Sequence, residues 1–206
     1  MGYRVVKGDA TCHVPLSKEA AIIVHVCNDI GAWGAGFVMA LSRKWLEPEE
    51  QYRNWFVNGY TMKEWDEEKD PEFAKRWNAE REKTKFELGN VGYTQVGENL
   101  IVGNMIGQHG CGRRLVPLKE GYYKEHKRLN SLIEEVGEPK SSPYSPIDYV
   151  ALYDCLTKVR DFALEKGYDV AMPMIGSKLA GGDWNFIEEM IKRVLKDVEV
   201  TVYQFD

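Results

Sequence analysis

The sequence contains no apolar stretch long enough to cross a membrane, and it has no charged-then-apolar leader at its start. A membrane-spanning helix needs about 20 consecutive apolar residues. A secretory leader needs a basic start followed by an apolar core. Because neither pattern is present, we expect no contact with a membrane and a cytoplasmic protein.

Cysteine is scarce, with four residues among 206, and no Cys-x-x-Cys pair occurs. Widely separated cysteines do not indicate the disulfide framework of a small secreted protein. Three short Cys/His pairs also lack any accepted spacing for metal ligands. We therefore expect reduced thiols, no metal site and no cofactor. The four are Cys12, Cys27, Cys111 and Cys155.

Positive charge is also in short supply. The chain has 27 Lys and Arg against 32 Asp and Glu, a formal net charge of −5, and no basic stripe. Proteins that hold nucleic acid in a groove present such a basic surface to the phosphates, so we expect no partner of that kind. A small anionic ligand stays compatible with the composition, because backbone amides hold phosphates without any net positive charge.

What the sequence does contain is typical of a globular protein, with 44% hydrophobic and 12% aromatic residues. Its 206 residues fit one domain, or one domain with a substantial insertion. Residues 46–86 have a different composition, crowded with charge, and helix-start signals at Pro48 and at Asp70-Pro71 predict a helical insertion there. We expect it to pack on the main sheet, and we hypothesise that it forms a flap over the ligand loop. Its tryptophans are interpreted as packing anchors: Trp55, Trp65 and Trp77.

A strand, a loop and a helix near the N-terminus organise the rest of the chain. Residues 22–27 are apolar and β-branched, which predicts a strand buried on both faces. Gly31, Gly34 and Gly36 follow, and such glycines permit positive φ and close approach of a ligand. The helix that begins at Phe37 directs free N–H groups at this loop, which suits a phosphate. The alternative is that the glycines only make a tight turn.

Strands and helices alternate along the remainder of the chain. The pattern predicts an α/β sandwich with its ligand crevice at one edge of the sheet, because glycine loops leave the strand ends and lead into helices. We expect strands over 3–8, 89–96, 100–106, 168–175 and 199–205, and helices over 121–136, 145–166 and 183–195.

Histidines are the main candidates for chemistry. His25 lies in the strand that leads to Asn28, where either catalysis or a buried core position explains it. His109 lies in the glycine-rich segment 107–114, which suits either a binding loop or a flexible surface loop. We interpret His13, which precedes a proline, as a surface residue without a role.

Several motifs together share their order and spacing with one known family, the macro domain. They are Gly8-Asp9, the apolar strand ending in Asn28, Trp33-Gly-Ala-Gly36, Met172-Pro-Met-Ile-Gly-Ser177 with Gly181-Gly-Asp-Trp184, and Val200-Thr-Val-Tyr203. The chain is most similar to the branch typified by the yeast ADP-ribose 1″-phosphate phosphatase. The resemblance implies a single macro domain over 1–206 with an insertion at about 46–86. It also implies a three-layer α/β/α sandwich with a mixed, mostly parallel central sheet.

The resemblance further implies an ADP-ribose pocket. Asp9 would bond the adenine amino group, Tyr203 would stack on the ring, and Asn28 would contact the distal ribose. The glycine loops would pack against the ribose and cradle the phosphates through their amides. The other residues implied in substrate binding are Gly8, Ala10, Trp33, Gly34, Ala35, Gly36, Phe37, Gly176, Ser177, Gly181 and Gly182.

The implied reaction is hydrolysis of ADP-ribose 1″-phosphate to ADP-ribose and phosphate without a metal. Such hydrolysis needs an oriented water and a proton donor or acceptor, and the catalytic candidates are His25, His109 and Asn28. One alternative is an ADP-ribosyl hydrolase that removes ADP-ribose from protein or nucleic acid. Its catalytic lysine has no counterpart around 102–107, and its catalytic aspartate corresponds to Ala180. A non-catalytic reader of ADP-ribose is the other alternative, and turnover on defined substrates separates the three.

Overall fold

A six-stranded sheet forms the centre of the protein, with strand order β1-β6-β5-β2-β4-β3. The computed structural model describes residues 2–15, 20–62 and 70–205, so Trp65 lies outside the described residues. β3 is antiparallel to β4 and the other pairings are parallel, which confirms the mixed, mostly parallel sheet. The strands are β1 (Tyr3–Lys7), β2 (Ala21–Asn28), β3 (Val91–Gly97), β4 (Leu100–Gln108), β5 (Asp169–Pro173) and β6 (Val200–Gln204).

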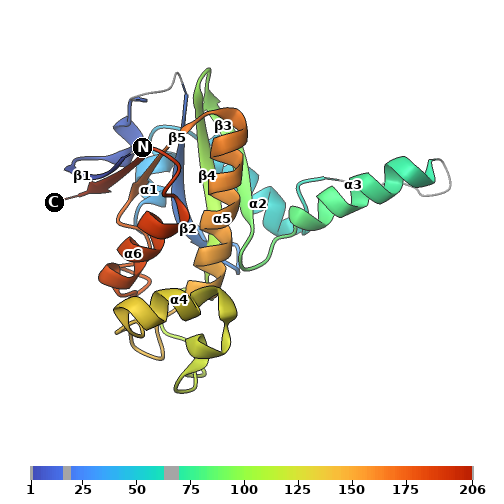
Figure 1. Cartoon of the computed structure of the whole chain (residues 1–206). Helices are drawn as coiled ribbons and strands as arrows, with labels where there is room; N and C mark the ends of the chain where they lie inside the picture. The colour runs from blue at the N-terminus through green and yellow to red at the C-terminus, as the bar shows by residue number, and fades with distance from the viewer. Residues whose placement is uncertain (1, 16–19, 63–69, 206) are drawn as a thin grey trace.

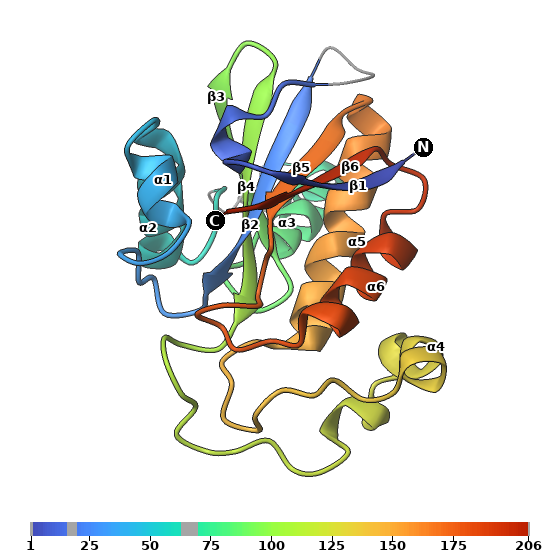
Figure 2. The ribbon, with the colours of Figure 1, turned by 90° about the vertical axis from the view of Figure 1, so that its left-hand side faces the viewer.

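Helices cover both faces of this sheet (Figure 2), which confirms the α/β/α sandwich. One face carries α1 (Val38–Ser42) and α2 (Glu47–Asn58), and the other carries α4 (Lys127–Val136), α5 (Tyr149–Lys166) and α6 (Trp184–Val194). Two short 3-10 helices, η1 (Ala10–Cys12) and η2 (Tyr122–Glu125), lie in the connections.

β2 is the strand around which both hydrophobic clusters are built. It pairs with β4 along its whole length and with β5 at its start. Alternate side chains of a strand point to opposite faces, so Ile22 and Val24 join the cluster under α5 and α6, while Ile23 and Cys27 join the cluster under α1 and α2. The continuous apolar run is explained by burial on both faces, as predicted.

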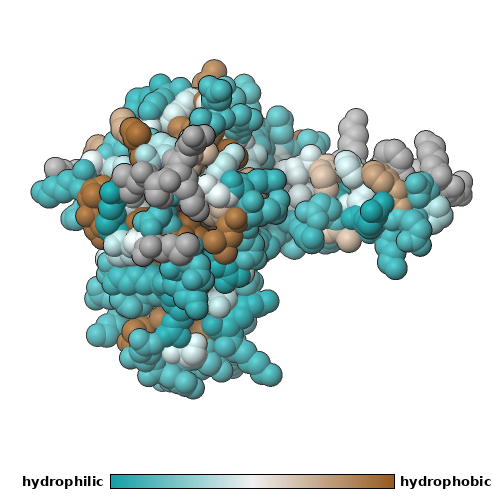
Figure 3. Space-filling view, turned by 45° about the horizontal axis from the view of Figure 1, so that its top comes forward, coloured by the Kyte–Doolittle hydropathy of each residue, from teal (hydrophilic) through white to brown (hydrophobic). Residues whose placement is uncertain are grey.

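The insertion at 46–86 contains α2 and α3 (Pro71–Lys83). α2 packs against β3 through the buried side chains of Tyr52 and Trp55, as expected for packing anchors. α3 begins at the predicted signal, where the Asp70 carboxylate accepts a hydrogen bond from the Phe73 amide at 3.0 Å. That start is at the outer end of an arm that stands away from the sheet (Figures 1 and 3), and the C-terminal end of α3 returns to α2, where Trp55 Nε1 donates to the Thr84 carbonyl.

Two predicted helix starts are wrong. The expected helix over 121–136 is interrupted at His126, whose backbone is extended (φ −99°, ψ 104°), and divides into η2 and α4. α5 begins at Tyr149, and its N-cap is Asp148, whose carboxylate accepts hydrogen bonds from the amides of Val150 and Ala151. Ser145, the expected N-cap, instead donates its hydroxyl to the Gly181 carbonyl at 3.0 Å.

The four cysteines are unpaired. Within residues 2–15, 20–62 and 70–205, no three His, Cys, Asp or Glu side chains gather closely enough to hold a metal ion. Among the same residues, no helix has the length and hydropathy needed to cross a membrane.

Candidate functional site

A crevice of about 750 Å³ lies at the carboxyl ends of the parallel strands, a size typical of small-molecule sites. The segments that follow β1, β2, β4, β5 and β6 line it, as expected for a parallel sheet. The predicted site residues found in its wall are Gly8, Asp9, Ala10, His25, Asn28, Trp33, Gly34, Ala35, Gly36, Phe37, Gly176 and Tyr203. Four predicted residues lie outside the wall: His109, Ser177, Gly181 and Gly182.

Asn28 organises the segment from 28 to 37, which we call the ligand loop. Its Oδ1 accepts hydrogen bonds from the amides of Ile30 (3.1 Å) and Ala32 (3.0 Å). Its Nδ2 donates to the Ala32 carbonyl at 2.6 Å. Since a carboxamide nitrogen carries two N–H donors, one donor remains without an acceptor among the described residues.

Two runs of backbone amides without a hydrogen-bond acceptor among the described residues lie in loops that line the crevice. From Gly34 to Val38, where Gly36 has φ +77°, the N–H groups donate to no acceptor in the described part of the chain. The same holds from Gly176 to Leu179, in what we call the second loop (176–180). A Cβ added at Gly36 would lie 3.1 Å from Leu179 Cδ1, so the two loops almost touch. Successive free amides of this kind bind anions.

Gly181 and Gly182 have a different role from the one expected. The Gly181 amide donates to the Lys178 carbonyl at 3.0 Å, and the Gly182 amide donates to the Gly176 carbonyl at 2.8 Å. A Cβ at Gly182 would lie 2.5 Å from the Gly176 oxygen, so only glycine fits. Both amides therefore donate to carbonyls within the second loop. The expectation that they cradle a phosphate is wrong. Ser177 likewise donates its hydroxyl inward, to the Met174 carbonyl at 2.9 Å.

α2 supports the ligand loop from behind. The buried Tyr52 hydroxyl donates to the Asn28 carbonyl at 2.6 Å. Arg53 Nη2 donates to the Trp33 carbonyl at 3.2 Å, and the Phe56 ring fills the space under Gly31. No described residue of the insertion lines the crevice, so the flap hypothesis is wrong for this part of the chain and the insertion acts as a brace.

We predict that Tyr52→Phe loosens the ligand loop. The substitution removes a buried donor, so we expect the free energy of unfolding to fall by about 1–2 kcal/mol and the affinity for the crevice ligand to fall severalfold. Urea unfolding and ligand titration measure both effects. Tyr153→Phe is the matched control, because the Tyr153 hydroxyl makes no hydrogen bond with described residues. Unchanged affinity in Tyr52→Phe would contradict the proposed support of the ligand loop by α2.

His25 is a buried core histidine. Its exposed fraction is 1%, and its Nε2 lies 2.6 Å from Asn104 Oδ1. Asn104 Nδ2 donates to the Pro48 carbonyl and to Gln51, which leaves Oδ1 as the acceptor and fixes the proton on His25 Nε2. The imidazole packs edge-on against Trp33 at 5.5 Å between ring centroids. This arrangement favours the structural interpretation of His25 over catalysis, since its donor is already committed.

The burial of His25 predicts an acid-sensitive contribution to stability. Burial lowers the pKa of His25 from 6.5 to about 4. Because the folded-state pKa is the lower one, the unfolded chain binds the proton first, and stability present above pH 6.5 is lost as the pH falls toward 4. We expect wild type to lose about 2 kcal/mol more than His25→Gln between pH 7 and pH 5. Chemical unfolding at both pH values measures this difference, His126→Gln serves as the control, and parallel losses in wild type and His25→Gln would contradict it.

One end of the crevice lies where β1 and β6 end. Asp9 Oδ1 accepts a hydrogen bond from the Thr11 amide at 2.8 Å. The Tyr203 hydroxyl lies 3.0 Å from Nδ1 of His13. His13 is 6% exposed, so its interpretation as a surface residue is wrong. Phe205, which sequence reasoning missed, is exposed and also lines this end.

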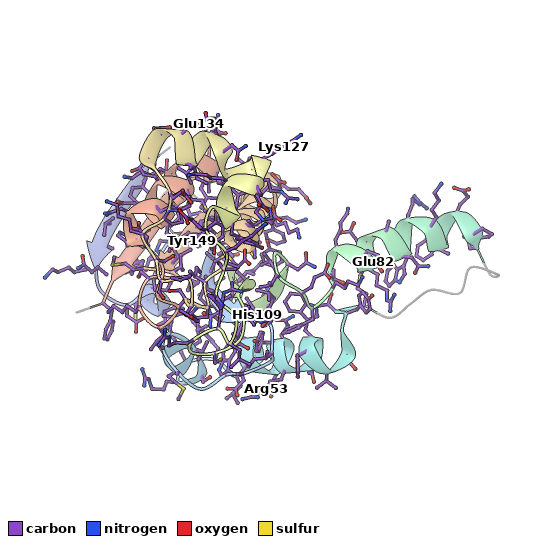
Figure 4. All side chains as sticks on the ribbon, turned by 90° about the horizontal axis from the view of Figure 1, so that it is seen from below. Arg53, Glu82, His109, Lys127, Glu134 and Tyr149 are labelled. Atoms are coloured by element: carbon purple, nitrogen blue, oxygen red, sulfur yellow. The ribbon has the colours of Figure 1, made fainter. Side chains whose placement is uncertain are left out.

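The other end lies beside β2 and β4. His109 Nδ1 is 2.7 Å from Asp29 Oδ2, and the Gly110 amide donates to Asp29 Oδ1 at 2.7 Å. The His109 side chain is 56% exposed, and Figure 4 shows it at the end of the molecule toward which β2 and β4 run. Cys111 and Gly112 of the same loop line the crevice, which agrees with the interpretation of 107–114 as a binding loop, although neither was singled out as a site residue.

No protein-family model matches the chain. Solved structures similar to it include a protein of unknown function from Bacteroides thetaiotaomicron, at 35% identity and TM-score 0.67 over 99% of this chain and 98% of that one. A macrodomain protein from Streptomyces coelicolor is 33% identical, with TM-score 0.63 and 98% of each chain covered. DarTG of Thermosipho africanus, solved in complex with ADP-ribose, shares the fold at 10% identity and TM-score 0.54, over 90% of this chain and 38% of that one.

A curated relative is the chromodomain-helicase-DNA-binding protein 1-like of Danio rerio, 27% identical over 205 residues. The alignment covers 98% of this chain and 15% of that protein. The chain thus spans about a seventh of the length of this relative.

Proposed function

The chain belongs to the macrodomain (macro domain) family, and we propose that its crevice binds ADP-ribose. The two runs of free amides, at 34–38 and 176–179, carry this proposal. A diphosphate presents several oxygen acceptors in a short span, and neutral amides hold such an anion in a protein of net negative charge. The ADP-ribose bound by the structural relative DarTG agrees with this ligand.

The two ends of the crevice suit the two ends of the ligand. Adenine would lie at the β1 and β6 end, where the free Oδ2 of Asp9 accepts from the amino group and the aromatic rings of Tyr203 and Phe205 stack. The distal ribose would lie at the other end, where the remaining N–H donor of Asn28 faces it. The diphosphate then lies between the two loops.

We propose in addition that the protein hydrolyses ADP-ribose 1″-phosphate. Asp29 Oδ2 lies 2.7 Å from Nδ1 of His109, an arrangement that orients the imidazole. Water attacks the phosphorus, the bond from phosphorus to the 1″ oxygen breaks, and that oxygen takes a proton as it leaves. His109, rather than the buried His25, is the group in this proposal that supplies the proton.

Phosphate release from ADP-ribose 1″-phosphate tests the proposed reaction. The purified protein with a chelator present should release phosphate over many turnovers and form ADP-ribose in equal amount. Absence of release with ADP-ribose binding retained would overturn the phosphatase and leave a hydrolase of ADP-ribosylated macromolecules or a reader. Release of ADP-ribose from modified protein or nucleic acid then separates those two.

A further inference from the structure

One cation of the crevice has no partner among the residues that the structure describes. Arg43 directly follows α1, lines the crevice and is exposed. Its guanidinium makes no hydrogen bond or ion pair with the residues described in 2–15, 20–62 and 70–205. Guanidinium groups in binding sites bind carboxylates or phosphates through paired N–H donors, so this side chain is free to meet an anionic ligand.

The packing of α1 places Arg43 at the β1 end of the crevice. Lys44 Nζ donates to the Thr11 carbonyl in η1 at 2.5 Å. Val38 and Leu41 share a buried cluster with Ala10 of η1. η1 follows β1, so the last turn of α1 lies beside the proposed adenine end, and Figure 2 shows α1 facing the end of β6 there.

Among the described charged side chains that line the crevice, Arg43 is the one available to bind an additional anion. The charged residues that line the crevice, among those described, are Asp9, Arg43 and Lys178. One oxygen of Asp9 is held by the Thr11 amide. Lys178 Nζ lies 3.5 Å from the Phe205 carbonyl. Arg43 is the one of these three whose charged group contacts no described residue.

We infer that Arg43 binds a phosphate on the adenosine ribose, so that the ligand class extends to ADP-ribose phosphorylated at a 2′ or 3′ hydroxyl. The inference rests on the proposed binding of ADP-ribose. Ala40 and Arg43, three positions apart in α1 and at its C-cap, both line the crevice, and Gly36 lines it just before the start of the same helix. With the diphosphate at Gly36 and adenine beside Asp9, the adenosine ribose lies over this face, and its hydroxyls approach Arg43.

Calorimetric titration with ADP-ribose and with its 2′- and 3′-phosphates tests the inference. We expect wild type to bind one phosphorylated isomer roughly tenfold more tightly than ADP-ribose, since a charge-assisted hydrogen-bonded pair has about this effect. Arg43→Met should remove that preference, so that the phosphorylated isomer binds no more tightly than ADP-ribose. Arg43→Lys, which keeps the charge and loses the planar fork, should keep part of the preference.

Lys75→Met on α3 is the matched control, because it removes one exposed positive charge outside the crevice. It should leave the preference intact. Equal affinity of wild type for ADP-ribose and both phosphorylated forms would overturn the inference, while the proposed function would stand. Equal weakening of all three ligands by Arg43→Met would also overturn it, because Arg43 would then serve the diphosphate. Absence of binding for all three would overturn the proposed function itself.

Discussion

Gly36→Val should reduce the affinity for ADP-ribose by at least about a hundredfold in a protein that still folds. A Cβ at this position lies 3.1 Å from Leu179 Cδ1, so a valine side chain enters the gap that the diphosphate needs. The backbone has φ +77°, which β-branched residues rarely adopt. Relaxation of that strain would also turn the free amides of the ligand loop away from the crevice. Calorimetric titration gives the loss of affinity.

Gly167→Val is the control for strain alone. Gly167 ends α5 with φ +72°, and a Cβ there meets nothing within 4 Å. Both variants should lose about 1–2 kcal/mol of folding free energy, while only Gly36→Val should lose binding. Micromolar binding retained by Gly36→Val would contradict the placement of the diphosphate between the loops.

His109→Ala should lower kcat for ADP-ribose 1″-phosphate by roughly 10²- to 10⁴-fold, the usual effect of removing a general acid or base. The affinity for ADP-ribose should change little, because in the proposal His109 acts only when the bond from phosphorus to the 1″ oxygen breaks. Asp29→Asn keeps an acceptor for the Gly110 amide and removes the carboxylate charge, so we expect a smaller fall in kcat. Steady-state phosphate release measures each variant.

His126→Ala is the matched control, since His126 begins α4 outside the crevice. Its kcat should equal that of wild type. An unchanged kcat in His109→Ala would contradict the proposed proton donor. Loss of turnover in a stably folded His25→Gln would instead return the catalytic role to His25.

The parts of the site that local pattern determines were predictable from the sequence. The apolar run of β2 and the glycines after it are local signals, and they correctly placed a strand that leads into a loop at the crevice. The Asp70-Pro71 helix start is local for the same reason. The assignment of Asp9 and Tyr203 to one end of the crevice depended on the family resemblance, because no local pattern joins them.

The contacts that sequence reasoning missed join residues that are far apart along the chain. His13 and Tyr203 are 190 positions apart, and Asp29 and His109 are 80 apart. The support of the ligand loop by Tyr52 likewise depends on how α2 packs on the sheet. Gly182 shows a further limit, because a glycine required for close backbone packing and a glycine required by a ligand give the same sequence signal.

Calorimetric titration of the wild-type protein with ADP-ribose tests the central claim, that the crevice is an ADP-ribose site. We expect saturable binding to one site per chain with a Kd at or below about 10 μM, close to 7 kcal/mol of binding free energy. Absence of saturable binding up to millimolar ligand, by a protein that circular dichroism shows to be folded, would contradict the claim.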